Sequence, residues 1–214
     1  MKTSIFHLEN KFLEEGYDFV IGVDEAGRGP LAGPVVACAA TLRTSDVPAG
    51  HSLFGHPMSK LIRDSKLLSE KQREELYDFI CEHFYVGIGI CDHKTIDRIN
   101  ILEATYLSMK KALSNLGKNI KAGKSIILVD GNKTIPNLSI EQKAIIGGDN
   151  LVKSISAASI IAKVTRDRMM REMHKKYPEY CFLQHKGYGT KLHMDMIRKH
   201  GPCEIHRRSF RPFH

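Results

Sequence analysis

The sequence lacks any apolar run approaching the roughly 20 residues that a helix needs to span a bilayer. Its first residues, MKTSIFHLENKF, have neither a long apolar core nor a small-residue cleavage site, so they do not predict a secretory signal. We therefore expect no membrane partner and a cytoplasmic location.

Cysteine is sparse, and its pattern excludes two further classes of protein. The chain has five cysteines, an odd number, and no two of them have CxxC spacing. This argues against a disulfide framework and against a structural zinc site. The zinc-protease pattern HExxH is also missing, so we expect reduced, mostly buried thiols and no zinc chemistry.

What the chain does contain fits one main domain, residues 1–214, with residues from about 177 to 214 as a short helical extension. The 214 residues are 42% hydrophobic and 26% charged, typical of a soluble globular protein. The net charge is +8, and 14 of the 32 Lys and Arg residues, against 5 of the 24 Asp and Glu residues, follow residue 149. This asymmetry indicates a surface that follows phosphates, with generic solubility charge as the alternative.

The segment FVIGVDEAGRGPLAGPVV, residues 19–36, organises the chain. An apolar strand-like run delivers Asp24 and Glu25 into a glycine-rich break, and a second apolar run, 35–42, predicts a hairpin-like return. Neighbouring strand residues point to opposite faces, so the two acids can share a ligand only if the strand ends or bulges between them. A solvated turn is the alternative.

Two more strand-like runs end in the same way. Residues 125–129 lead to Asp130 beside Gly131, and residues 144–146 lead through two glycines to Asp149. Ligands gather at such strand ends in open α/β sheets, although each case alone is an ordinary Asp-Gly turn. Clustered carboxylates repel one another unless a cation neutralises them, and oxygen ligands favour Mg²⁺ or Mn²⁺. Two such ions could support phosphodiester hydrolysis.

The remaining pattern predicts mostly helices. Ser69, with Gln72 three positions later, predicts the capped start of one helix. The run 84–91 predicts a strand whose glycines permit a neighbouring element to approach closely. The other expected helices cover 5–15, 102–116, 151–176 and 191–199.

The motif DEAGRGPLAGPVV resembles the signature of ribonuclease HII. Further segments match that family in the same order, namely DSKLLS at 64–69, VDGN at 129–132, GGDNLVKSISAASIIAKVTRDR at 147–168 and HKGYGTKLH at 185–193. The ending GPCEIHRRSF at 201–210 is also similar. The resemblance implies an α/β, three-layer ribonuclease H-like fold, in which a five-stranded mixed sheet is flanked by helices and followed by a C-terminal helical extension. It also assigns catalytic and metal-binding roles to four acids, Asp24, Glu25, Asp130 and Asp149, and leaves open which of them chiefly adjusts metal or product exchange.

The resemblance also implies a substrate. It predicts hydrolysis of the RNA strand of RNA–DNA hybrids and incision 5′ to ribonucleotides embedded in duplex DNA, giving 5′-phosphate and 3′-OH ends. Its implied role is the removal of misincorporated ribonucleotides and primer RNA by a monomeric enzyme. The loop Gly27, Arg28 and Gly29 would read the ribose together with Tyr188, because the 2′-OH alone distinguishes the two sugars.

Three cations, Lys66, Lys163 and Arg166, are expected to contact the substrate backbone. The family usually has a second lysine where this chain has Leu67, which predicts a weaker phosphate contact there. Segment 100–103 resembles a family segment near the substrate backbone and reads equally well as a helix start.

Two other functions stay open at this point. Ribonuclease HIII performs related hybrid cleavage, but it carries an additional N-terminal domain and lacks the GRG loop, and only about 18 residues precede the first strand here. A basic nucleic-acid-binding protein without enzymatic activity would need no acids at strand ends.

Overall fold

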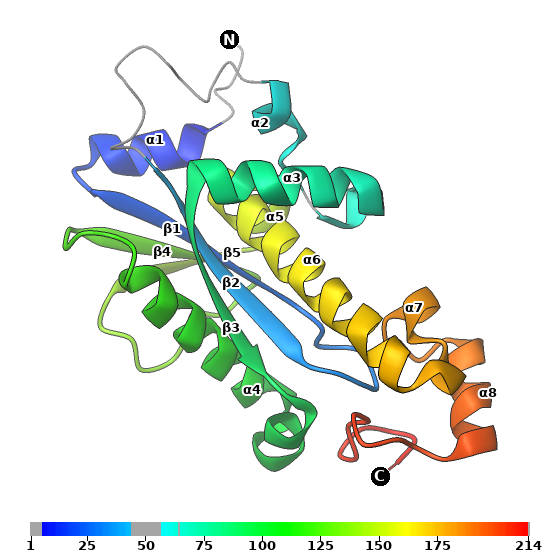
Figure 1. Ribbon diagram of the computed structural model, residues 1–214. Helices are drawn as coiled ribbons and strands as arrows, with labels where there is room; N and C mark the ends of the chain where they lie inside the picture. The colour runs from blue at the N-terminus through cyan, green and yellow to red at the C-terminus, as the bar shows by residue number, and fades with distance from the viewer. Residues whose placement is uncertain (1–5, 44–56, 64, 214) are drawn as a thin grey trace.

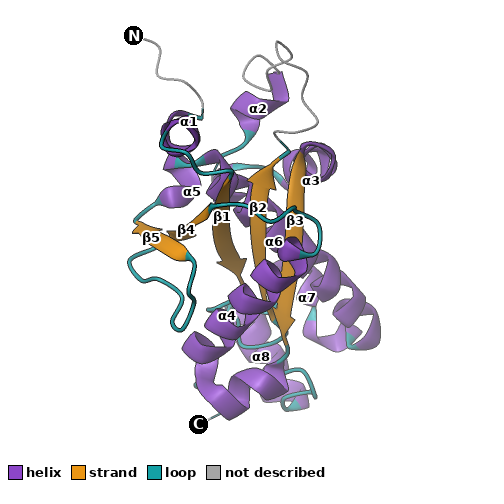
Figure 2. Ribbon diagram, turned by 90° about the vertical axis from the view of Figure 1, so that its left-hand side faces the viewer, coloured by secondary structure: helices purple, strands orange, loops and turns teal. Residues whose placement is uncertain are grey.

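A five-stranded mixed sheet forms the centre of the molecule. The computed structural model describes residues 6–43, 57–63 and 65–213. Its strands are β1 (Phe19–Ala26), β2 (Val35–Leu42), β3 (Phe84–Cys91), β4 (Ser125–Asp130) and β5 (Glu141–Ile145). They lie side by side in the order β3-β2-β1-β4-β5, as Figure 2 shows. The β1–β2 and β2–β3 pairs are antiparallel, which confirms the hairpin-like return, and the β1–β4 and β4–β5 pairs are parallel.

Helices cover both faces of this sheet. They are α1 (His7–Glu14), α2 (Pro57–Leu61), α3 (Glu70–His83), α4 (His93–Gly117), α5 (Gly148–Leu151), α6 (Lys153–Lys176), α7 (Phe182–His185) and α8 (Lys191–His200). Two short 3₁₀ turns, Ser65–Leu67 and Pro178–Tyr180, join some of them. Among the described residues, no helix is both long and apolar enough to cross a membrane.

The hydrophobic core has one layer on each side of the sheet. On one face α4 packs on β3, β2 and β1, and its Met109 and Leu116 share an apolar cluster with Ile127 of β4. On the other face α6 packs on β1 and β2, and α3 packs on α6 and β3, with Ile161 and Leu76 in their shared apolar cluster. Figure 1 shows α4 and α6 on opposite sides of the strands. This arrangement confirms the three-layer fold expected from the sequence.

Glycines in the strands let both helices approach the sheet closely. A Cβ atom built on Gly22 of β1 would lie 2.1 Å from the carbonyl carbon of Ser154 at the start of α6. On the other face, a Cβ on Gly89 of β3 would lie 1.9 Å from the carbonyl oxygen of Ser108 in α4. Real Cβ atoms do not tolerate such distances, so the prediction that the β3 glycines permit close packing is confirmed.

Side chains close in sequence cap one helix, and a side chain distant in sequence caps another. The Ser69 hydroxyl accepts a hydrogen bond from the backbone N–H of Gln72, and the Gln72 side chain accepts one from the Ser69 N–H, as predicted. At the start of α6, the carboxylate of buried Glu9 in α1 accepts a bond from the Ser154 N–H at 2.8 Å. A residue 145 positions earlier therefore satisfies a backbone donor that the first turn of α6 leaves unpaired.

Three element boundaries differ from those predicted from the sequence. The helix expected over 151–176 is interrupted at Val152, whose extended backbone separates α5 from α6. The strand expected at 144–146 is β5, Glu141–Ile145, a polar edge strand without an apolar run to indicate its start. Helix α4 begins at His93, with Asp92 as its cap, and kinks at Asn100 (φ 64°), whose side chain accepts bonds from the N–H groups of Leu102 and Glu103. The helix start predicted at segment 100–103 is therefore real but internal.

The C-terminal segment from Tyr177 onward folds against the far end of α6. It forms a separate apolar cluster that includes Ala32, Met170, Phe182 and Ile197. Because Ala32 belongs to the β1–β2 connection, this segment reaches back to the loop that follows the acidic pair.

Candidate active site

Asp24 and Glu25 lie on opposite faces of an unbroken strand. The β1–β2 register continues through Ala26, so no bulge or strand end separates the two acids. Asp24 faces α6, where the Ser159 side chain forms a hydrogen bond with it. Glu25 faces α4 and lines a cleft with Thr105. The local break that would bring both acids to one ligand is therefore not present.

The carboxylate that lies beside Asp24 comes from the neighbouring strand β4, not from Glu25. Asp130 ends β4, which runs parallel to β1, so its side chain emerges at the same edge of the sheet as Asp24. Asp149 follows the left-handed turn at Gly147 (φ 65°) and lies in α5. One carboxylate oxygen from each of Asp24, Asp130 and Asp149 lies within 4.8 Å of the others. This acidic triad is the convergence that the sequence predicted for these three residues.

Burial makes the charge of the triad unfavourable without a cation. Burial, and then the charges of Glu25 and Asp130, raise the pKa of Asp24 well above its ordinary value. Burial, and then the charge of Asp149, also raise the pKa of Asp130, and the backbone N–H groups of Asp149 and Gly148 partly offset that rise.

Several observations show that the triad suits a hard divalent cation. The Oδ1 atom of Asp130 is buried and has no hydrogen-bond partner among the described residues. The donors are carboxylate oxygens alone, the ligands that Mg²⁺ and Mn²⁺ prefer. Lys66 lies at the rim, with its Nζ atom 3.3 Å from Asp149 Oδ2. Among the described residues, only Lys66 forms a salt bridge with a triad carboxylate, so a bound cation would neutralise the negative charge that remains.

Glu25 is held beside the triad rather than within it. Its Oε1 atom lies 3.4 Å from Arg28 Nη1. Burial raises the pKa of Glu25, while Arg28 lowers it and the charge of Asp130 raises it. Glu25 therefore feels the charge of Asp130, although it faces the other side of the sheet from Asp24.

Comparisons with known proteins agree with this geometry. The family model described as ribonuclease HII matches residues 21–212. The chain belongs to the ribonuclease HII family.

A ribonuclease HII from Caldicellulosiruptor bescii is 50% identical over 206 residues, covering 96% of this chain and 92% of the relative. The crystal structure of ribonuclease H2 from Pyrococcus horikoshii superposes with a TM-score of 0.68 at 28% identity, covering 91% of this chain and 95% of that one. Bst-RNase HIII, solved in complex with Mn²⁺, shares the fold with a TM-score of 0.67 at 18% identity, covering 86% of this chain and 63% of that one.

Membership of the ribonuclease HII family makes the chain a nuclease with ribonuclease H activity, and its acidic triad fits the metal dependence of that class. A binding protein without enzymatic activity is thereby excluded. The alternative that the chain is a ribonuclease HIII is not supported either, because the likeness to that protein extends to the fold alone.

The ribonuclease HII signature loop lies directly against the predicted tyrosine. A Cβ atom on Gly29 would lie 3.7 Å from Cε1 of Tyr188, whose side chain is 44% exposed. Gly27 has φ of 101°, and a Cβ there would lie 2.7 Å from the carbonyl oxygen of Pro34, so only glycine fits. Arg28 extends from this loop toward Glu25. The loop and Tyr188 therefore form one surface near the triad.

The structure gives different surroundings to the three cations predicted to contact the substrate backbone. Lys66 is exposed at the triad, and Leu67 beside it is also exposed. Asp64 of the same motif lies outside the described residues. Lys163 is mostly covered, its side chain 23% exposed, and its Nζ atom lies 2.8 Å from Asp167.

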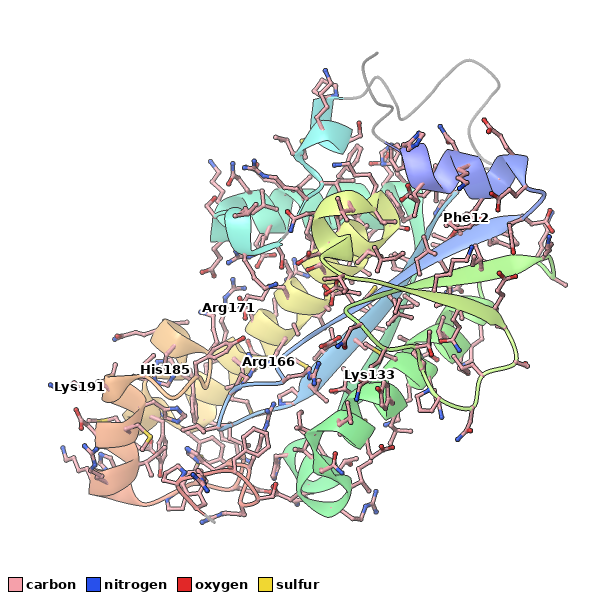
Figure 3. The ribbon with its side chains drawn as sticks, turned by 180° about the vertical axis from the view of Figure 1, so that it is seen from behind. Phe12, Lys133, Arg166, Arg171, His185 and Lys191 are labelled. Atoms are coloured by element: carbon pink, nitrogen blue, oxygen red, sulfur yellow. The ribbon has the colours of Figure 1, made fainter. Side chains whose placement is uncertain are left out.

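Arg166 is a correction, because it is fully buried and cannot reach a bound nucleic acid in this conformation. Its guanidinium donates to the carbonyl oxygens of Ala32, Pro34 and Lys186. Figure 3 labels Arg166 between α6 and the β1–β2 connection. It therefore holds the signature loop in place rather than touching phosphate.

Sequence reasoning missed two contributors to the site. Ser159 meets Asp24 from α6, and its position within a run of small residues gave no sign of that contact. Arg207 binds the carbonyl oxygens of the signature loop from the C-terminal segment. The match of GPCEIHRRSF to the family's ending was the one available signal for Arg207.

Proposed function

We propose that the chain hydrolyses the RNA strand of RNA–DNA hybrids and incises duplex DNA on the 5′ side of single embedded ribonucleotides. The observation that carries this proposal is the adjacency of two features, an acidic triad suited to divalent cations and a glycine loop packed against an exposed tyrosine. The first fits phosphodiester hydrolysis, and the second fits the reading of one sugar.

The chain's own residues divide the work. Asp24, Asp130 and Asp149 would hold Mg²⁺ or Mn²⁺ at the edge of the sheet, with Glu25 beside them. When bound, one or two such ions supply activation of water and neutralise the charge that develops on the leaving oxygen. Water oxygen forms the new bond to phosphorus as the bond to the 3′ oxygen breaks. The products are a 3′-OH on the upstream nucleotide and a 5′-phosphate on the ribonucleotide.

Recognition of the ribose belongs to the loop Gly27–Gly29 and Tyr188. Because Gly27 and Gly29 lack side chains, a sugar can approach the loop backbone closely, and the partly exposed Tyr188 lies beside it. Lys66 is the cation best placed to meet a phosphate at the triad. Residues from about 177 to 214 would extend the contact with the duplex, since they carry Tyr188 and 7 Lys and Arg residues against 3 Asp and Glu residues.

The cellular role that follows is removal of misincorporated ribonucleotides and of primer RNA. A monomer in the cytoplasm remains the expectation from the sequence.

Cleavage mapping on end-labelled duplexes tests this proposal. Three substrates are compared with and without Mg²⁺: all-DNA, an RNA–DNA hybrid, and DNA with one ribonucleotide. We expect cleavage of the last two only, dependent on Mg²⁺, with a single cut 5′ to the lone ribonucleotide. Tyr188→Phe should keep more activity on that substrate than Tyr188→Ala, because the ring remains. Cleavage of the all-DNA duplex at the same rate would overturn the proposed sugar recognition.

A further inference from the structure

Arg207 connects the C-terminal segment to the signature loop. Its side chain is fully buried, yet within the described part of the chain its guanidinium donates only to backbone carbonyl groups. The four acceptors are the carbonyl oxygens of Gly27 at 2.6 Å, Arg28 at 3.0 Å, Gly33 at 3.0 Å and Pro34 at 3.1 Å. One planar fork therefore fixes both ends of the loop that contains Gly27, Arg28 and Gly29.

The preceding residue, His206, connects the same segment to Tyr188. The His206 Nδ1 atom accepts a hydrogen bond from the Cys203 N–H at 2.9 Å, so the ring carries its proton on Nε2. That Nε2 lies 3.1 Å from Nε2 of His193, which must then accept. His193 in turn carries its proton on Nδ1 and donates to the Tyr188 carbonyl oxygen at 3.0 Å.

Burial keeps this chain of hydrogen bonds in one protonation state. Burial, and then the neighbouring histidines, lower the pKa of His193 and of His206 to about 4. Both rings are therefore neutral at neutral pH, and the chain from Cys203 through His206 and His193 to Tyr188 has one consistent direction.

Backbone contacts tie the two side-chain connections together. His206 forms a β-bridge with Ala32, and the Arg207 N–H donates to the Leu31 carbonyl oxygen at 2.8 Å. The Leu31 N–H donates in turn to the carbonyl oxygen of Gly187, next to Tyr188. The signature loop and the tyrosine loop thus meet on the dipeptide His206-Arg207.

A role in packing alone does not explain this choice of residues. Arg207 forms no salt bridge with a described carboxylate, and burial together with the nearby charge of Arg166 lowers its pKa to about 9. A buried charge without a counter-ion is unfavourable, and apolar residues fill such sites at lower cost. What the guanidinium provides is four simultaneous bonds of fixed geometry to one loop.

We propose that His206 and Arg207 are positioning residues that set the distance and orientation between the Gly27–Gly29 loop and Tyr188, and thereby the enzyme's preference for a ribose over a deoxyribose. This inference rests on the proposed function, because it assigns a purpose to the same sugar-reading surface. Neither residue touches the substrate; each acts through the group that does.

The test measures sugar discrimination in binding. In an Asp130→Asn background with Mg²⁺, the Kd is measured by fluorescence anisotropy for a DNA duplex with one ribonucleotide and for the same all-DNA duplex. The ratio of the two Kd values reports the sugar reading, and a loss of folded protein alone lowers both affinities equally. Arg207→Lys keeps a positive charge but loses the fork, and we expect it to reduce the ratio at least fivefold.

Matched variants separate positioning from packing. His206→Phe keeps a ring but removes the donor to His193, and should also reduce the ratio, whereas His206→Gln restores a donor and should recover part of it. Arg208→Lys makes the same change at the exposed neighbour and should leave the ratio unaltered. An unchanged ratio in both Arg207→Lys and His206→Phe would overturn the inference.

A different result would contradict the proposed function. If the wild-type protein does not cleave beside a ribonucleotide, the nuclease proposal is wrong whatever the ratios are. If the wild-type protein cleaves there but the Asp130→Asn protein binds both duplexes equally, the loop and Tyr188 do not distinguish ribose from deoxyribose. The inference about His206 and Arg207 is then wrong.

Discussion

Replacing Gly22 by Ala tests how closely α6 must approach the sheet. The added Cβ would lie 2.1 Å from the carbonyl carbon of Ser154 and 2.2 Å from the backbone nitrogen of Ile155. Both atoms are helix backbone, so no side chain can rotate away, and α6 must move outward by roughly 1.3 Å to restore an ordinary contact of about 3.4 Å. Such overpacking should lower the free energy of unfolding by about 3 kcal/mol. For a chain of this length, the melting temperature should then fall by about 6–12 °C.

The same displacement should disturb the acidic triad. Gly22 is two residues before Asp24, and α6 begins shortly after Asp149, so moving the helix away from the sheet changes the distance between these carboxylates. We expect the folded variant to bind Mn²⁺ more weakly, so that the midpoint of its titration shifts to a higher Mn²⁺ concentration.

Melting curves followed by circular dichroism measure the stability change. Gly117→Ala is the matched control, because a Cβ there has no atom within 4 Å, and the substitution should be neutral or stabilising by up to about 1 kcal/mol. A Gly22→Ala protein that melts within about 1 °C of wild type would refute the packing argument.

Two further predictions concern buried carboxylates. Glu9→Ala should lower the free energy of unfolding in urea by about 1–3 kcal/mol, because the Ser154 N–H loses its acceptor. Glu9→Gln keeps an acceptor and should retain most of the stability. Equal losses in the two variants would argue against the cap. In metal-free protein, the raised pKa of Asp24 means that the folded protein binds this proton more tightly than the unfolded chain does. The contribution of Asp24 to the free energy of unfolding therefore falls as the pH rises from the ordinary pKa of 3.8 through the higher pKa of the folded state. The melting temperature of Asp24→Asn relative to wild type should therefore increase with pH, and saturating Mg²⁺ should remove that advantage; a constant difference would contradict the burial argument.

Much of the fold could be predicted because local signals agreed with the tertiary structure. The apolar runs at 19–23 and 35–42 marked β1 and β2, and the Ser69 cap depended only on residues three positions apart. The triad followed from a general property of α/β sheets, that neighbouring parallel strands end at one edge.

The rest depended on information that the sequence pattern does not contain. The side-chain alternation along β1 separates Glu25 from Asp24, but whether a glycine-rich segment continues the strand depends on its pairing with β2. A positive charge on a helix predicts solvent or phosphate, whereas Arg166 is buried against carbonyl groups more than 130 residues away. The polar strand β5 forms because the edge of β4 needs a partner, a requirement visible only in three dimensions.

The most direct test of the central claim is Mn²⁺ binding measured by electron paramagnetic resonance. Three residues from distant parts of the chain should act as one site, so Asp24→Asn, Asp130→Asn and Asp149→Asn should each weaken binding by at least about tenfold. Asp195→Asn, which removes an exposed carboxylate paired with Arg198, is the control and should bind Mn²⁺ as wild type does. Wild-type affinity in all three triad variants would contradict the account.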